Sequence, residues 1–133
     1  MEPVVLYLSD GWRKEAEPPL LVYDTRGNDD LKRCIDEYEK GNLDTAGIAS
    51  GIIEALFDKD FVGSGKHWDR DGSSCSRIDD DTGNGEYVAY KCSCSATWDW
   101  KDIYSVATSK ATIRVFVNRP LIHVVGYKYY VAG

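Results

Sequence analysis

The sequence predicts an α+β fold, in which an antiparallel sheet of about five to six strands packs on two helices in the order β-β-α-α-loop-β-β-β-β. The final stretch, residues 111–133, carries β-branched and aromatic residues around one turn, which is typical of a β-hairpin. Residues 28–57 carry apolar side chains at helical spacing, and two short apolar runs precede them. Because the two helices follow one another and do not alternate with strands, we expect both to cover one face of the sheet.

The length of 133 residues predicts a single α+β domain over residues 1–133. A chain of this size buries roughly two-thirds of its unfolded surface, so it needs neither a metal nor a disulfide to be stable. Hydrophobic residues make up 43% of the chain and charged residues 29%, which is ordinary for a globular protein, and the aromatic content of 12% excludes a disordered one.

The first two strands are expected at residues 4–8 and 20–24, where short apolar runs are rich in β-formers. The polar connection between them is too long for a tight hairpin, and Pro18 and Pro19 hold the approach to the second strand extended. Trp12 lies in this connection and is expected to cover the core, because large aromatic side chains dominate core burial. The alternative is an exposed contact residue.

The first helix is expected after residue 28, because apolar residues follow the spacing of one helical face: Leu31, Cys34, Ile35 and Tyr38. Asn28 or Asp29 can cap its start, and Gly41 is expected to end it.

A second helix is expected from Asp44 or Thr45 to Phe57, and its apolar content predicts the buried central helix. Gly47 and Gly51 lie four residues apart on it. Glycine in a helix costs about 1 kcal/mol relative to alanine, so we expect a neighbouring helix or strand to approach closely at both positions.

Residues 58–85 predict a long irregular loop, because glycine, aspartate and serine surround little apolar material. Loops of this length within one domain are usually functional or mobile. Alternation resumes over residues 86–100, where one or two strands are expected, and residues 102–107 are expected to form a short helical turn. In the final hairpin, Gly126 predicts a bulge that re-aims residues 127–130 and makes them a candidate binding surface.

The N-terminus carries an acidic residue, Glu2, where a signal peptide would be positive, and no apolar run approaches the ~20 residues of a membrane span. A cytoplasmic location without membrane contact is therefore expected, with the cysteines mainly reduced. Two alternatives stay open: a zinc site from His67, Cys75, Cys92 and Cys94, whose spacing is poor, and a disulfide from Cys75 to Cys92 or Cys94. Neither a metal nor another cofactor is expected.

The formal charge of −6 is distributed unevenly: residues 1–100 carry 21 acidic against 11 basic residues, and residues 101–133 carry one against five. An acidic body disfavours nucleic acid and favours a basic protein partner. The alternative is an acidic surface that serves solubility alone. The oligomeric state is not predicted.

Familiar site motifs are incomplete. Residues 63–66 lack the glycine and hydroxyl residue that a phosphate loop requires, and residues 67–78 place Ile78 where a calcium loop needs a carboxylate. His67 and His123 could act as an acid–base pair only if the fold brought them together. No catalytic residue is therefore assigned, and an enzyme is the less favoured class.

The favoured function is that of a small acidic protein-binding module, an inhibitor or immunity-type protein that neutralises a basic partner. Tryptophans stand among aspartates, a combination that can anchor and attract such a partner. The candidate residues are Trp68, Asp69, Asp71, Asp79, Asp80, Asp81, Trp98 and Trp100. The alternative is a small-molecule-binding domain or small enzyme with an aromatic pocket near His123, lined by Tyr127, Tyr129 and Trp98.

Overall fold

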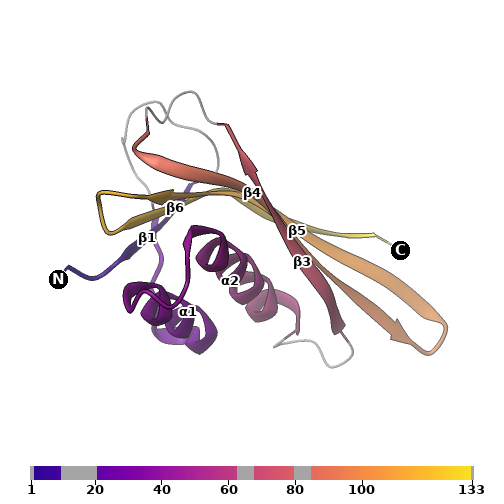
Figure 1. Cartoon of the computed structure of the whole chain (residues 1–133). Coiled ribbons are helices and arrows are strands. Elements are labelled where there is room, and N and C mark those ends of the chain that lie inside the picture. The colour runs from indigo at the N-terminus through magenta and orange to yellow at the C-terminus, as the bar shows by residue number, and fades with distance from the viewer. Residues whose placement is uncertain (1, 10–20, 63–67, 80–84, 133) are drawn as a thin grey trace.

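The computed structural model describes residues 2–9, 21–62, 68–79 and 85–132 (Figure 1). Its elements are β1 (Val5–Ser9), β2 (Leu21–Val22), the 3-10 helix η1 (Thr25–Gly27), α1 (Asp29–Glu39), α2 (Thr45–Phe57), the π-helix η2 (Asp58–Val62), β3 (Trp68–Ile78), β4 (Tyr87–Trp100), β5 (Ile103–Phe116) and β6 (Leu121–Ala132). The predicted α+β order is confirmed. Within the described part of the chain, neither α1 nor α2 has the length and apolar character of a membrane-spanning helix.

The strands form one six-stranded sheet in the order β2-β1-β6-β5-β4-β3. Every neighbouring pair is antiparallel except β1 and β6, which run parallel with Val5 opposite Leu121. The sheet is therefore mostly antiparallel and not wholly so. A parallel pair needs a long crossover, which the intervening helices and strands supply. Both helices lie on one side of the sheet, which we call the helix face (Figure 1).

Side-chain caps start both helices where the sequence indicates. Asn28 Oδ1 accepts a hydrogen bond from the Leu31 amide at 3.0 Å, and Asp44 Oδ1 accepts one from the Gly47 amide at 2.7 Å. Each cap satisfies a backbone donor that has no partner within its own helix. The predicted helix starts are confirmed.

The core lies between α2 and the helix face of the sheet. Alternate residues of β4, β5 and β6 face the helices, and small residues under α2 allow it to approach closely. The buried set includes Ile48, Ile52, Ile53, Leu56 and Phe57 of α2, and Leu6, Cys92, Cys94, Ala96, Ala107, Ile113, Val115, Ile122 and Val124 of the sheet. The second helix is the buried central helix, as predicted.

Gly51 lies where α1 and α2 approach most closely. A Cβ atom built on Gly51 would meet the Cys34 Sγ atom of α1 at 2.7 Å, which confirms the predicted close contact at this position. The nearest atoms to Gly47 belong to Leu43 and Asp44, in the connection before α2. Of the two glycines, therefore, Gly51 is closely approached by another helix and Gly47 is not.

The Gly51→Ala variant is expected to lose about 1–2 kcal/mol of stability, because overpacking outweighs the helix propensity gained from alanine. In a Cys34→Ala background the same substitution should be nearly neutral, since the sulfur atom that it would meet has gone. Urea unfolding of the four proteins of this double-mutant cycle measures the coupling. Equal losses in both backgrounds would contradict the contact.

The predicted loop over residues 58–85 is wrong over β3, which is a regular strand. Residues 68–78 pair antiparallel with β4 over its whole length, from Trp68 opposite Trp98 to Ile78 opposite Ala89, with one register shift between Arg70 and Gly72. β3 is the edge strand of the sheet, so most of its side chains face water and its composition is polar. This arrangement also excludes the calcium loop considered for residues 67–78.

The predicted helical turn at residues 102–107 is wrong as well. β4 is one strand of 14 residues, and it joins β5 through Lys101 and Asp102, whose φ angles are 50° and 66°. Two central residues with positive φ are the geometry of a type I′ hairpin turn, which is usually made by Asn-Gly or Asp-Gly. Because Lys-Asp is an uncommon pair at such a turn, the sequence did not indicate a hairpin here.

The final hairpin, β5–β6, is confirmed, with its connection at residues 117–120. Gly126 has a φ of +67°, and the register changes from Thr112 opposite Val125 to Lys110 opposite Lys128. One extra residue therefore stands in β6, as expected of a bulge. Before it, even-numbered residues of β6 point to the helix face, and after it odd-numbered residues do.

Cys75 and Cys92 form a disulfide between directly opposed positions of β3 and β4, with their Cα atoms 4.2 Å apart. The expectation of mainly reduced cysteines is therefore wrong for this pair. Cys34 and Cys94 remain free thiols, and burial raises the pKa of both, that of Cys94 to about 11. Opposed positions on neighbouring strands bring two Cβ atoms within disulfide reach, a relation that depends on strand register.

Candidate functional site

One end of the sheet extends beyond the helices. The β4–β5 hairpin projects past the end of α2, next to the start of β3 and the end of β6 (Figure 1). We call residues 68–71, 97–106 and 129–132 the sheet end. Neither α1 nor α2 extends over the tip of this hairpin (Figure 1), and residues 99–104 are exposed.

Exposed apolar side chains gather at the sheet end. Of the nine large hydrophobic residues that are exposed in the described ranges, six lie here: Trp100, Ile103, Tyr104, Tyr129, Tyr130 and Val131. The other three are Leu21, Val22 and Val117, which lie on β2 and in the β5–β6 connection. Exposed apolar groups that cluster in this way mark interaction surfaces more often than scattered ones do.

Register places these side chains on two faces. Trp100 stands opposite Ile103, and both belong to the helix face of the sheet beyond α2. Asp99 stands opposite Tyr104 on the other face. Trp100 is 44% exposed, Ile103 59% and Tyr104 61%, so each contributes a large area of side chain to solvent.

Trp68 and Trp98 form the base of this surface. They stand opposite each other on β3 and β4, and their rings meet edge to face with centroids 5.5 Å apart. Both are only partly exposed, and Trp68 packs against the core. The two predicted anchors therefore support the sheet end, while Trp100 presents the accessible indole.

Four exposed carboxylates lie at the sheet end: Asp69, Asp71, Asp99 and Asp102. Register places Asp69 and Asp99 on the face opposite the helices, on the other side of the sheet from Trp100. Thr97 donates a hydrogen bond to Asp71 Oδ2 at 2.6 Å, which orients that carboxylate. Lys101 lies in the same turn, with its Nζ atom 5.6 Å from the centre of the Trp100 ring. Among the named candidates, Asp79 follows the opposite end of β3, and Asp80 and Asp81 lie outside the described residues.

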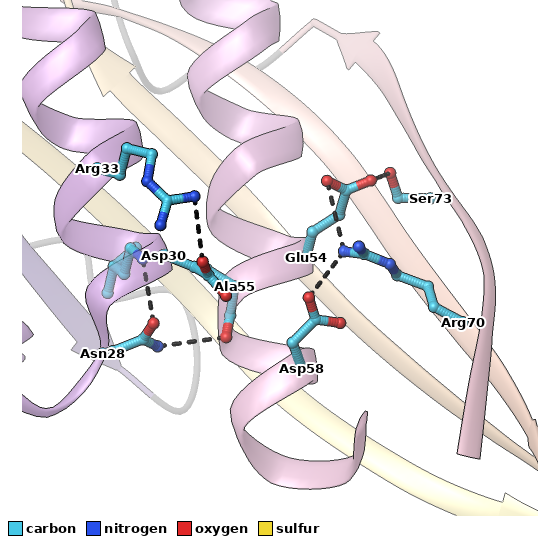
Figure 2. A network of polar contacts seen from close by, with 9 residues as sticks. Asn28, Asp30, Arg33, Glu54, Ala55, Asp58, Arg70 and Ser73 are labelled. Carbon is cyan, nitrogen blue, oxygen red and sulfur yellow. Dashed lines mark hydrogen bonds and ion pairs between the residues drawn. The ribbon is translucent and has the colours of Figure 1, made fainter. Parts of the chain in front are cut away.

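An ion-pair network fixes the start of β3 to α2 (Figure 2). Arg70 contacts Asp58 at 2.8 Å and Glu54 at 3.7 Å, and Ser73 donates a hydrogen bond to Glu54 at 2.7 Å. Burial raises the pKa of Asp58 despite the opposing effect of Arg70. The network therefore holds the part of β3 that carries Asp69 and Asp71 in a defined position.

Asn28 extends this support to the other helix. Its side chain caps α1 and also donates a hydrogen bond to the carbonyl oxygen of Ala55 in α2 at 3.2 Å (Figure 2). Buried amide side chains that satisfy two backbone groups are costly to replace, because either group would be left without a partner. The start of α1 is thereby tied to the last turn of α2.

His123 does not share a pocket with the tyrosines that were predicted beside it. It is 8% exposed and lies on the face opposite the helices, where its Nε2 atom is 2.7 Å from Ser9 Oγ. Tyr127 lies on the helix face and donates a hydrogen bond to Asp60 at 2.6 Å. The bulge at Gly126 separates the two, because it reverses which residues face the helices.

The electrostatic surroundings of these two residues differ. Burial, with a further contribution from Arg114, lowers the pKa of His123 to about 4. Burial and the hydrogen bond to Asp60 raise the pKa of Tyr127. His123 is therefore a neutral buried imidazole at pH 7, and Tyr127 a neutral phenol.

The proposed zinc ligands are not assembled as a set. Cys75 and Cys92 are joined as a disulfide, and His67 lies outside the described residues. Within the ranges that the structure describes, no three His, Cys, Asp or Glu side chains cluster closely enough to hold a metal ion.

Comparison of the chain with protein family models, with characterised proteins and with solved structures finds no match. The candidate site therefore rests on the geometry of this chain.

Sequence reasoning missed three exposed apolar residues of the sheet end: Ile103, Tyr104 and Val131. Tyr130 lies within the candidate binding surface that was predicted over residues 127–130. Ile103 and Tyr104 were assigned to a helical turn, although residues 103–108 include several residues that favour strands. Val131 was counted as an ordinary strand residue, because exposure at the end of a sheet depends on where the helices stop.

Proposed function

We propose that this protein is a protein-binding module, of the inhibitor or immunity type, that uses the sheet end to engage a basic partner. The observation that carries the proposal is the concentration of exposed apolar side chains at one end of the sheet, with four exposed carboxylates at the same end. The aromatic and aliphatic groups provide the anchor, and the carboxylates select the charge of the partner.

The anchor is Trp100 with Ile103. They stand opposite each other on neighbouring strands, so a partner can cover both with one pocket. Indole rings at the centre of an interface contribute most when surrounding residues exclude water from them. The rigid base formed by Trp68 and Trp98 reduces the entropy lost when the surface is ordered on binding.

The charge of the sheet end favours a basic partner. Asp69, Asp71, Asp99 and Asp102 outnumber the two basic residues, Arg70 and Lys101, among its exposed charged groups. Arg70 is already paired with Asp58 and Glu54. Carboxylates near the rim of an interface accelerate encounter with a positively charged protein and repel acidic ones. The overall charge of −6 acts in the same direction at longer range.

The Trp100→Ala variant is expected to bind the partner about 30-fold more weakly, which corresponds to about 2 kcal/mol. The partner is first captured from lysate of the producing cells on immobilised parent protein at low salt, and then purified. Titration of the purified partner against both proteins gives the two dissociation constants. Leu21→Ala is the matched control, since Leu21 is 67% exposed but lies on β2.

The carboxylates are tested separately by kinetics. The Asp69→Asn, Asp71→Asn and Asp99→Asn triple variant should associate more slowly, with a smaller dependence on salt and little change in dissociation. Stopped-flow association at about 50 mM and about 300 mM salt measures this difference. If Leu21→Ala weakens binding as much as Trp100→Ala, or if the parent associates at a salt-independent rate, the proposal is contradicted.

A further inference from the structure

The face of the sheet opposite the helices contains a hollow of about 580 Å³ near its middle. It crosses four strands, β3 to β6, and lies away from Trp100 and the β4–β5 turn. We call it the basic hollow. Its lining residues are Ser74, Ser76, Lys91, Cys92, Ser93, Lys110, Ala111, Thr112, Val125, Gly126 and Lys128.

Three neighbouring strands each contribute one lysine to the basic hollow. Lys110 of β5 stands directly opposite Lys128 of β6, and Lys91 of β4 stands opposite Thr112, two residues along from Lys110. Directly opposed residues have Cβ atoms about 5 Å apart, and diagonal neighbours are about 7–8 Å apart. The three flexible side chains can therefore reach a common point above the sheet.

The bulge at Gly126 brings the third lysine to this face. Without the extra residue, the alternation that buries Ile122 and Val124 against the helices would also direct Lys128 toward the helix face. With Gly126 at a φ of +67°, Lys128 instead faces the same side as Lys110. A conformation that favours glycine thus places the ammonium group of Lys128 beside that of Lys110.

These lysines have no counter-charge within the described residues. The described lining of the hollow contains no carboxylate, and no described Asp or Glu lies within ion-pair distance of any of the three lysines. The described contact of the Lys110 ammonium group is the Tyr130 ring, 5.8 Å away. Like charges on directly opposed residues destabilise a sheet, so this arrangement is unfavourable unless an anion occupies the hollow.

Hydroxyl groups complete the lining. Ser74 and Ser93 stand opposite each other with their Oγ atoms 3.3 Å apart, while Ser76 and Thr112 stand opposite Lys91 on either side. Each hydroxyl can donate one hydrogen bond to an oxygen of a ligand. The Cys75–Cys92 disulfide cross-links the two strands that carry the three serines, which keeps these donors in register.

We propose that the basic hollow binds a small molecule that carries two or more phosphate groups. Ammonium groups bind phosphate as point charges, and the hydroxyls supply directed donors to its oxygens. The volume lies within the range of small-ligand sites. Nucleic acid is the less suitable ligand, because the protein is acidic overall and carboxylates stand at the sheet end of the same face.

Pyrophosphate is the probe. Calorimetric titration at about 50 mM salt should give a dissociation constant below about 1 mM, with inorganic phosphate binding about 10-fold more weakly. Amide signals of residues near Lys91, Lys110 and Lys128 should shift in NMR spectra on addition of pyrophosphate. The Lys91→Gln, Lys110→Gln and Lys128→Gln triple variant should lose at least about 30-fold in affinity. Its urea midpoint should equal or exceed that of the parent, because repulsion between the lysines has been removed.

The matched control carries Lys32→Gln on α1, Lys40→Gln at the C-cap of α1 and Lys101→Gln in the β4–β5 turn. It changes the net charge by the same amount as the test variant. It should keep its affinity within about threefold, since long-range charge effects are screened. The proposal is overturned if the control loses as much affinity as the test variant, if the shifted amides lie elsewhere, or if pyrophosphate does not bind. It is also overturned if a short oligonucleotide binds more than about 100-fold tighter than pyrophosphate and displaces it.

Discussion

Reduction of the Cys75–Cys92 disulfide is expected to lower the free energy of unfolding by about 3 kcal/mol. The bond joins residues 17 apart in the sequence, and a cross-link over a loop of this size restricts the unfolded chain by about that free energy. β3 is the edge strand, so its amides should be the first to exchange when the bond is broken. Urea unfolding with and without reductant measures the loss, and hydrogen exchange locates it.

The control for this experiment is the Cys75→Ala and Cys92→Ala double variant. It retains the two free cysteines, Cys34 and Cys94, so any effect of the reductant on them appears in both proteins. The double variant should unfold near the midpoint of the reduced parent and should not respond to reductant. If the parent does not respond either, its cysteines are reduced thiols and the disulfide is absent.

Acidification from pH 6.5 to about pH 4 is expected to remove about 3 kcal/mol of stability through His123. In the unfolded chain this histidine takes up a proton near pH 6.5, whereas burial and Arg114 keep it neutral in the folded protein until about pH 4. The unfolded state therefore binds more protons within this window. The stability is fully present above pH 6.5 and is lost as the pH falls through the window.

The His123→Gln variant isolates this effect, because glutamine can keep a hydrogen bond to Ser9 but has no proton to gain. Urea unfolding at intervals between pH 7 and pH 4 should give a shallower dependence for the variant, since the carboxylates titrate in both proteins. The chain has 2 histidines, so the NMR signal that the variant lacks identifies His123 directly. A titration midpoint near 6.5 for that signal would contradict the buried, neutral imidazole.

Several residues of the candidate site were predicted from the sequence, but the reason that they lie together was not. Trp98, Trp100 and Tyr129 were chosen for their aromatic character, and Asp69 and Asp71 for their charge. They come together because β3 pairs with β4 from Trp68 onward, and because the β4–β5 hairpin extends beyond α2. Neither pairing register nor the length of a strand relative to a helix can be derived from local composition.

His123 and Tyr127 were predicted to line one pocket, but they lie on different faces of the sheet. They lie four residues apart in the sequence, and a regular strand would place both on one face. The bulge at Gly126 was predicted from the sequence, but its effect on the two faces depends on the register with β5, where Thr112 and Lys110 flank the shift. The predicted aromatic pocket is therefore divided between the two sides of the sheet.

Local patterns determined the helices of this protein. The caps Asn28 and Asp44 and the apolar spacing from Leu31 to Phe57 act within a few residues of each other, so the sequence contains the whole signal. Only the tertiary structure decided that β3 is a strand, that Cys75 opposes Cys92 and that Lys91, Lys110 and Lys128 share one face. These properties arise from pairing between segments far apart in the chain, and the free energy of that pairing outweighs the weak local preference of polar residues for loops.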